Sequence, residues 1–423
     1  MARACARFRR IFGPDAFEYL PKTFMLPADK SELAADWELR KDSGQMYIYK
    51  PPSGCKGIGI RIISDPTTQI SAKANAVVSH YLDDPFLVDG LKFDMRIYVV
   101  ITCFQPLRVY VHEQGLVRFC TAKYEGSAKK TRKNRYRHLT NYSLNKNNKA
   151  FIRNIDADRD DIGHKWSLRA FRAWMQANGH DDAKVWSSIE DLVMKTLLAV
   201  EVPINTNMQL HVPSRNNCFQ LLGFDVMLDA ALKPWLIEVN TQPSLASDSP
   251  MDKRIKAAVV TDTLHLIQIR EYDRRRLSEV VEREKVARLH GEKGSGRSNT
   301  DNVRRREVCS GQRMALAGMT EDDFEVLSEC EAEFQRAGGF ARVFPNADDG
   351  KTLQWSKFFE SRRYYNILLL EWVTRPREDM GLTVAQYYQR VLDAQTRTKR
   401  AHPAAPPSLR AQPPSPGAHR GGG

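Results

Sequence analysis

Between about Ala16 and Leu245 the chain is a series of short apolar runs separated by Gly, Pro and Asn. Apolar runs of this length, bounded by residues that favour turns, are typical of β-strands. One longer block interrupts them, from about Ser167 to Val200, where apolar residues recur every three or four positions as on the buried side of a helix. A chain that mixes many short strands with helices folds as an α/β or α+β domain, and we predict that class here.

Turn residues and apolar content also place the individual elements. Within the helical block, Asp181 and Asp182 stand where an N-cap is expected. The predicted strands are Met46–Lys50, Ile58–Ile63, Phe93–Thr102, Leu107–His112, Leu116–Cys120, Cys218–Leu228 and Pro234–Asn240.

Composition indicates the size of the protein, its cellular compartment and the class of its partners. The chain has 423 residues, of which 42% are hydrophobic, enough for the cores of two or three domains. Its formal charge of +13 favours an acidic macromolecular partner, with nucleic acid, an anionic membrane and an acidic protein tail as candidates. Seven cysteines without a CxxC spacing favour a reducing, intracellular compartment over a disulfide framework or a zinc site. We expect neither a signal peptide nor a membrane span, because no apolar stretch is long enough.

Three polar residues interrupt the last two apolar runs. Asp225 precedes Glu238 by 13 residues, and DAALKP between them reads as a turn about Ala231 and Leu232. A hairpin would therefore bring Asp225 opposite Glu238, with Asn240 one step further along the same face. Two carboxylates and an amide oxygen suit Mg²⁺. The alternative is a strand end at which all three face solvent.

A glycine-rich loop follows the run that ends at Lys50. In KPPSGCKGIGI, Lys56 is surrounded by glycines, among them Gly57 and Gly59. Such a loop lets backbone N–H groups and a lysine approach phosphate closely. It matches neither GxxxxGK[ST] nor GxGxxG, and most glycine-rich loops of this kind are ordinary hairpin turns.

Charged residues also alternate along LKFDMRIYVVI. Strand geometry places Lys92, Asp94 and Arg96 on one face, which either faces water or lines a polar cleft. We expect Arg118 in a neighbouring strand that follows a turn at Gly115. Arginines capture phosphate or carboxylate through two parallel hydrogen bonds, and they stabilise charge on a phosphoryl group.

The rest of the chain is more polar. The run from 129 to 137 holds six basic residues and is either a solvated loop or a docking surface for an acidic partner. We predict a helical extension with a basic second half over 251–290, a linker over 291–311 and a small helical appendage over 312–395. The Pro- and Gly-rich residues 396–423 are expected to be disordered.

Five sequence blocks resemble, in order, the tubulin tyrosine ligase-like family, whose members have an ATP-grasp fold. The likeness covers roughly Ala16 to His290 and is greatest to the tubulin polyglutamylases that favour chain elongation. It implies an ATP-grasp core over 17–250, preceded by a basic stub, residues 1–16, in place of a further family domain. The blocks are YIYKPPSGCKGIGI, LVDGLKFDMRIYVVIT, PLRVYVHEQGLVRF, HLTNYSLNK and LLGFDVMLDAALKPWLIEVNTQPSL.

The resemblance also implies roles for individual residues. It makes Asp225, Glu238 and Asn240 the ligands of Mg²⁺ bound with ATP, and Glu238 a catalytic residue with Arg96 and Arg118. The two arginines would hold the γ-phosphate or an acyl phosphate. The implied nucleotide contacts are Lys50, Lys56, Gly57, Gly59, Lys92, Asp94, Thr140 and Asn141, of which the last two lie near the nucleotide or the incoming amino acid.

The implied reaction is ATP-dependent amide formation. A glutamate side chain in a tubulin C-terminal tail would be phosphorylated, and the amine of free L-glutamate would attack the acyl phosphate. The basic helix around Arg274–Arg276 resembles the segment that docks these enzymes on microtubules. Expected partners are tubulin tails and microtubules, without nucleic acid or membrane, for a monomer in the cytoplasm, on the cytoskeleton, or in the cilium or basal body. Alternatives are a catalytically impaired microtubule-binding protein and a glycine ligase of the same family.

Overall fold

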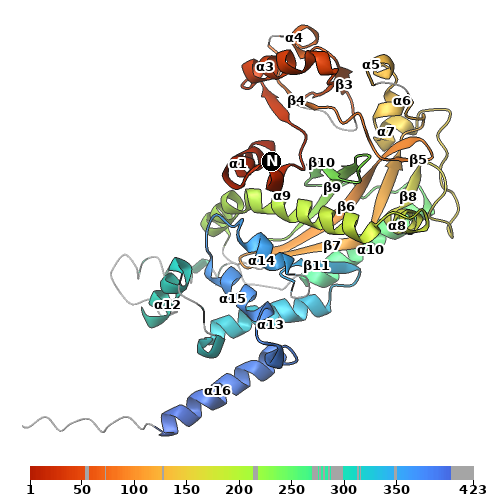
Figure 1. Cartoon of the computed structure of the whole chain (residues 1–423). Helices are drawn as coiled ribbons and strands as arrows, with labels where there is room; N and C mark the ends of the chain where they lie inside the picture. Colours follow the sequence, from red (N-terminus) through yellow and green to blue (C-terminus); the bar gives the residue numbers. More distant parts are fainter. Residues whose placement is uncertain are drawn as a thin grey trace, which may run out of the picture.

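A computed structural model describes residues 1–52, 57–71, 73–125, 128–212, 218–268, 299–311, 314, 316–346 and 350–401, with isolated positions between 275 and 286. Two antiparallel sheets are surrounded by helices (Figure 1), which confirms the mixed α/β class. The strands are β1 Thr23–Leu26, β2 Tyr47–Lys50, β3 Arg61–Ile63, β4 Ala76–His80, β5 Leu87–Val88, β6 Leu91–Phe104, β7 Leu107–Phe119, β8 Lys165–Ser167, β9 Gln220–Leu228, β10 Pro234–Asn240 and β11 Phe340–Phe344.

The smaller sheet has four strands in the order β1-β4-β2-β3, and the larger sheet has seven. The main path of the larger sheet is β10-β9-β6-β7-β11, with β5 beside β6 and β8 beside β7. The helices are α1 Ala2–Phe12, α2 Pro14–Phe17, α3 Lys30–Arg40, α4 Pro66–Gln69, α5 Ala128–Thr131, α6 Arg135–His138, α7 Tyr142–Asn145, α8 Leu168–Ala177, α9 Asp182–His211, α10 Pro250–Ile267, α12 Asn299–Ser310, α13 Glu321–Gln335, α14 Lys351–Ser356, α15 Tyr364–Val373 and α16 Val384–Ala401.

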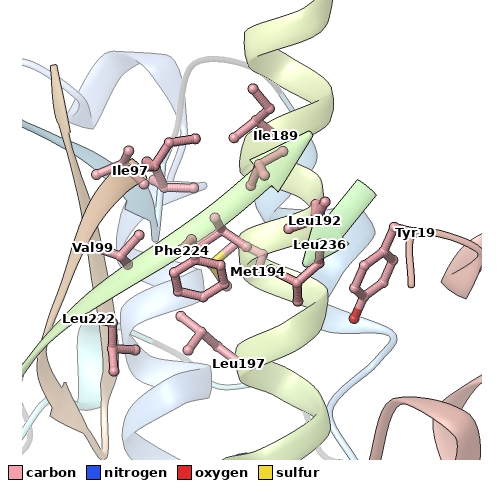
Figure 2. Packing of buried hydrophobic residues seen from close by; sticks show 14 of the residues in the cluster. Tyr19, Ile97, Val99, Ile189, Leu192, Met194, Leu197, Leu222, Phe224 and Leu236 are labelled. Atoms are coloured by element: carbon pink, nitrogen blue, oxygen red, sulfur yellow. The ribbon is translucent and has the colours of Figure 1, made fainter. Parts of the chain in front are cut away.

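Alternation along β6 divides the large sheet into two differently covered faces. Ile97 and Val99 point into the main core, where they lie in one cluster with Leu192 and Leu197 of α9 and with Phe224 of β9 (Figure 2). The opposite face of the sheet carries the even-numbered residues of β6. Part of that face is covered by α10, through a buried cluster of Tyr98, Leu116, Met251, Ile255 and Val259.

The predicted helical block forms two helices, α8 and α9. The block breaks between Ala177 and Asp182, and α9 then continues through Pro203 to His211. Asp181 is the N-cap of α9, since its side chain accepts a hydrogen bond from the Lys184 backbone N–H, as predicted.

The turn predicted at Gly115 is wrong. Strand β7 runs unbroken from Leu107 to Phe119, and its turn from β6 lies at Gln105 and Pro106 instead. Gly115 lies within the strand. Glycine is needed there because a Cβ would come within 2.5 Å of the Arg96 backbone oxygen. The strand predicted over Ile58–Ile63 is also shorter, and only Arg61–Ile63 are extended.

The segment before residue 17 and the segment after residue 249 both contribute side chains to core clusters. The stub, residues 1–16, contains α1, whose Phe8 is fully buried, and whose Phe12 packs edge-on against Phe358. Residues 250–267 form α10, a core helix, so the predicted microtubule-binding extension begins in the core. Its basic residues Arg274 and Arg276 lie outside the described residues.

The C-terminal segments also contain more regular structure than expected. The predicted linker, 291–311, contains α12 from Asn299 onward, and α16 extends to Ala401, inside the predicted disordered tail. The appendage, 312–395, has its own helical core, but it also donates β11 to the large sheet. The division of the chain into these domains stays a prediction. Among the described residues, no helix is long and apolar enough to cross a membrane.

Candidate active site

The hairpin of β9 and β10 forms as predicted. Asp225 pairs with Glu238 across the two strands, and Asn240 pairs with Gly223. A register shift between Leu236 and Glu238 marks a local irregularity in β10. The Asn240 amide nitrogen donates to the Glu238 carboxylate at 3.2 Å and to the Gly223 carbonyl at 3.2 Å.

Two arginines meet the Asp225 carboxylate in the floor of the site. Arg96 donates two hydrogen bonds to it, one of 3.0 Å from Nη2 to Oδ2. Arg118 Nη2 lies 2.8 Å from the same Oδ2, and Arg118 also makes two hydrogen bonds to Asp94. Gly223 makes room for this arrangement, because a Cβ there would lie 2.9 Å from Arg96 Cδ. The charged face of β6 is therefore a buried polar cluster rather than a water-facing surface.

The two carboxylates of the hairpin differ in their electrostatics. Burial acts to raise the pKa of Asp225, but the guanidinium groups of Arg118 and Arg96 outweigh it and hold this pKa well below its ordinary value. Glu238 makes no ion pair with a described residue, and it faces the cleft. Its side chain is exposed to the cleft, and partial desolvation there, followed by the Asp225 carboxylate, raises the pKa of Glu238 against the opposing effect of Lys50. The negative charge at this position is thus uncompensated by an arginine.

Two lysines lie along the same cleft. Lys50 ends β2 in the small sheet, and its Nζ lies 3.4 Å from the Ile237 carbonyl oxygen of β10 in the large sheet. Lys92 is 4% exposed and donates to the Tyr81 hydroxyl at 2.8 Å. No carboxylate of a described residue is within ion-pair distance of Lys92, and burial lowers its pKa to about 8. Lys92 is thus a buried cation that fits an anionic ligand.

The glycine-rich loop comes close to another predicted site residue. Gly57 has a φ of +77° and Gly59 one of +76°, a backbone conformation that favours glycine. A Cβ on Gly57 would lie 2.7 Å from Asn141 Oδ1, so the loop packs directly on Asn141. Thr140 and Asn141 line the cleft. Lys56, the other predicted contact, lies outside the described residues.

These residues share one cavity between the small and the large sheet. Its walls include most of the predicted site residues: Lys50, Lys92, Asp94, Thr140, Asn141, Asp225 and Glu238. Sequence analysis missed the rest of the lining, which is mainly apolar and suited to a flat ring: Ile48, Ile60, Val77, Leu82, Leu139, Met227 and Leu236.

Tyr81 and His138 were also missed as parts of the site. The Tyr81 hydroxyl lies 2.7 Å from His138 Nδ1 and accepts the hydrogen bond of Lys92. Burial, followed by the positive charge of Lys92, lowers the pKa of His138 to about 4, so the ring is neutral at neutral pH. His138 stands beside the predicted Thr140 and Asn141 in HLTN, which was the one signal for it in the sequence.

A second charged cluster borders the site where α10 begins. Residue Lys165 in β8 pairs with Arg118 in β7, which sets it beside the arginine cluster. Its Nζ lies 2.7 Å from Asp248, 3.4 Å from Asp252 and 4.0 Å from the centre of the Tyr142 ring. Lys256 lies 3.0 Å from Asp252. Nothing in the sequence signalled this cluster, because its members come from three separate segments.

The donor set of the hairpin fits Mg²⁺ better than a softer metal. No group of three or more His, Cys, Asp or Glu could hold a metal ion in the part of the chain that the structure describes. Asp225, Glu238 and Asn240 offer two carboxylates and an amide oxygen, and Mg²⁺ is usually bound by one or two carboxylates together with water and substrate phosphates.

Comparison with known proteins agrees with this geometry. Residues 1–276 match the model of the tubulin-tyrosine ligase family, and the chain belongs to that family. A cleft between two antiparallel sheets, with its polar floor on a hairpin, is the ATP-grasp arrangement that the resemblance implied, and this fold is confirmed.

Several curated relatives are about one-third identical to the chain. Tubulin polyglutamylase TTLL5 of Homo sapiens is 34% identical over 383 residues, which cover 86% of this chain and 29% of the relative. Tubulin monoglutamylase TTLL4 of Mus musculus is 35% identical over 395 residues, covering 88% and 32%. Tubulin polyglutamylase ttll6 of Danio rerio is 35% identical over 363 residues, covering 85% and 43%. The chain thus spans less than half the length of these relatives.

Proposed function

We propose that this chain is an ATP-dependent ligase that adds glutamate to glutamate side chains of tubulin C-terminal tails. The observation that carries the proposal is the cleft itself, in which two lysines that make no ion pair with a described residue line one cavity with the Glu238 carboxylate, whose charge Lys50 offsets only in part. An anionic ligand accompanied by a cation would pair with both, the anion with the two lysines and the cation with the carboxylate. The names of the relatives, tubulin polyglutamylases and a monoglutamylase, supply the substrates.

ATP is the anionic ligand in this proposal. Lys50 and Lys92 would bind its phosphates, and the apolar lining contributed by β2, β4 and β10 would hold the adenine ring. Gly57 and Gly59 would let the loop that contains Lys56 approach the phosphates. Asp225, Glu238 and Asn240 would hold Mg²⁺, which when bound neutralises charge on the phosphates.

The reaction follows as two displacements. A side-chain carboxylate oxygen of the tubulin tail attacks the γ-phosphorus of ATP, ADP leaves, and an acyl phosphate forms. The amine nitrogen of free L-glutamate then attacks the acyl carbon, inorganic phosphate leaves, and the nitrogen gives up a proton as the amide forms. No covalent bond to the enzyme is needed.

Arg96 and Arg118 would stabilise the charge on the acyl phosphate. Their carboxylate partners use only part of the five N–H donors that each guanidinium carries, so donors remain for phosphate oxygens. Asp94 and Asp225 hold both side chains in place before substrate arrives, which lowers the reorganisation needed in the transition state. Burial of this cluster would keep water from hydrolysing the acyl phosphate.

The proposal includes the remaining expectations from the sequence. The chain would act as a monomer on microtubules, in the cytoplasm or in cilia, with its positive charge attracting the acidic tails.

Incorporation of labelled glutamate tests the proposal. The full chain is incubated with ATP, Mg²⁺ and microtubules, beside the Glu238→Gln variant and beside microtubules whose tails have been removed by protease. We expect incorporation by the parent protein into intact microtubules alone. Incorporation by the variant would refute the role of Glu238, and silence of a folded parent protein that still binds microtubules would favour a binding protein without catalysis.

Two substitutions of substrate refine the outcome. Labelled glycine in place of glutamate separates a glutamate ligase from a glycine ligase of the same family. Tubulin that already carries short glutamate chains should be a better substrate than unmodified tubulin if the chain elongates, and a poorer one if it initiates.

A further inference from the structure

The segment from Lys129 to Arg137 concentrates positive charge on the surface. It contains three lysines, Lys129, Lys130 and Lys133, and all three are exposed. Its three arginines donate to backbone carbonyls, and none of the ion pairs among the described residues includes any of these six side chains. A cluster of six cations without paired carboxylates is an attractive surface for an acidic partner.

This basic segment is attached to the nucleotide cleft at two points. Arg135 Nη2 donates to the Gly57 carbonyl oxygen at 2.8 Å, which ties the segment to the glycine-rich loop. Within the segment, the Thr131 hydroxyl lies 3.0 Å from His138 Nε2, and the other nitrogen of that ring contacts Tyr81 in the cleft wall. In Figure 1 the corresponding helices α5, α6 and α7 follow one after another at one side of the molecule.

The chain passes directly from this segment into the cleft lining. Leu139, Thr140 and Asn141 follow it and all line the cavity. Only six residues, 134–139, separate Lys133 from Thr140, and helix α6 shortens that path, so a peptide of about seven extended residues spans it. A peptide with one side chain in the cleft would thus place its neighbouring residues over the exposed lysines.

We propose that the basic segment 129–137 is the docking surface for the glutamate-rich sequence that flanks the modified residue. This inference rests on the proposed function, because the acceptor is taken to be an acidic tail. Carboxylates of the neighbouring glutamates bind the three lysines, while the acceptor glutamate enters the cleft. Nucleic acid is the less favoured partner, because the cleft that the segment borders is built to receive a carboxylate and a nucleotide.

A charge-reversal variant tests the docking surface. The variant Lys129→Glu/Lys130→Glu/Lys133→Glu lowers the formal charge from +13 by 6. The matched control is Lys30→Glu/Lys73→Glu/Lys357→Glu, which makes the same change at exposed lysines that do not line the cleft. Both are compared with the full-length parent protein by fluorescence anisotropy, with a labelled peptide that contains a run of glutamates, and by the KM for that peptide and for ATP.

We expect the first variant to bind the peptide at least about tenfold more weakly than the parent protein, since three exposed charge contacts are lost and reversed. The KM for the peptide should rise by a similar factor while the KM for ATP stays unchanged. The control should resemble the parent protein in both. Equal weakening in the two variants, or no weakening in the first, would overturn the proposal.

Two further outcomes separate this inference from the proposed function. If no protein incorporates glutamate but only the first variant loses peptide binding, the docking surface stands and the proposed reaction fails. If single-stranded DNA of equal charge binds the parent protein as tightly as the glutamate peptide and competes with it, the surface is a general polyanion site and the inference is refuted.

Discussion

Replacing Glu238 by glutamine separates the binding of a cation from the stability of the fold. The parent carboxylate faces Asp225 and is paired with no arginine, and its pKa is raised by burial and by that neighbour. Glutamine keeps the oxygen that accepts from Asn240 and removes the negative charge. We therefore expect Glu238→Gln to stabilise the protein at neutral pH in the absence of nucleotide and Mg²⁺, by less than about 1 kcal/mol because the side chain faces the wet cleft.

The pH dependence of this effect has a definite sign. An acid whose pKa is higher in the folded than in the unfolded state favours folding while it is protonated, and that contribution is lost as the pH rises through its folded pKa. The gain from Glu238→Gln should therefore be absent below the ordinary glutamate pKa of 4.5 and appear above it. Urea unfolding of both proteins at several pH values measures this difference.

Binding of Mg²⁺ and ATP should change in the opposite direction. Loss of a group that only supports a metal ligand lowers metal affinity about 10–100-fold, so loss of a ligand itself should cost at least about 100-fold. Calorimetry with ATP and Mg²⁺, repeated with EDTA, measures it, and Glu113→Gln on the exposed part of β7 is the matched control. A variant that loses more than about 2 kcal/mol of stability, or that binds ATP with unchanged dependence on Mg²⁺, would refute this assignment.

Three further substitutions test the arrangement of the site. Asp225→Asn leaves Arg96 without a carboxylate in a buried position and should lower the free energy of unfolding by about 3–5 kcal/mol in urea titrations, whereas a loss below 1 kcal/mol would contradict the ion pairs. Lys92→Met should stabilise the protein without nucleotide at neutral pH, and this advantage should shrink as the pH rises from about 8 to 10.5, where the parent lysine is neutral only when folded; a pH-independent difference would argue against a buried charge. Gly115→Ala should cost about 1–3 kcal/mol, because its Cβ meets the Arg96 backbone oxygen, while Gly381→Ala, with open space around it, should be nearly neutral in thermal unfolding.

The pairing of strands that are close in the sequence could be predicted. The β9–β10 hairpin could be predicted because the turn residues and the alternation along two neighbouring strands fix the register within a short segment. The same reasoning failed for β7. Gly115 looks like a turn residue in the sequence. In the structure it lies within β7, where the lack of a side chain allows the backbone of β6 to come close. The sequence around Gly115 does not reveal this neighbouring strand.

The tertiary part of the site could not be predicted from the sequence. The ion pairs that join Arg118 to Asp94 and Asp225 depend on β9, β6 and β7 being neighbouring strands of one sheet. Lys165 and Asp252 come together because α10 returns across the same face of the sheet. Strand β11 was missed because FARVF is short and stands among helices, so its partner, β7, decides its conformation rather than its own composition.

Strand β11 limits where the chain can be truncated. It pairs with Val109–His112 of β7 and so covers a hydrogen-bonding edge that would otherwise be open. Open edges of long apolar strands are sites of aggregation and strand exchange. The segment that matches the family, 1–276, ends before this strand, and it also lacks Phe358, which packs against α1. A fragment trimmed to the family match would therefore expose backbone donors and acceptors beside an apolar surface, and the C-terminal boundary of a stable, soluble fragment lies beyond Phe358.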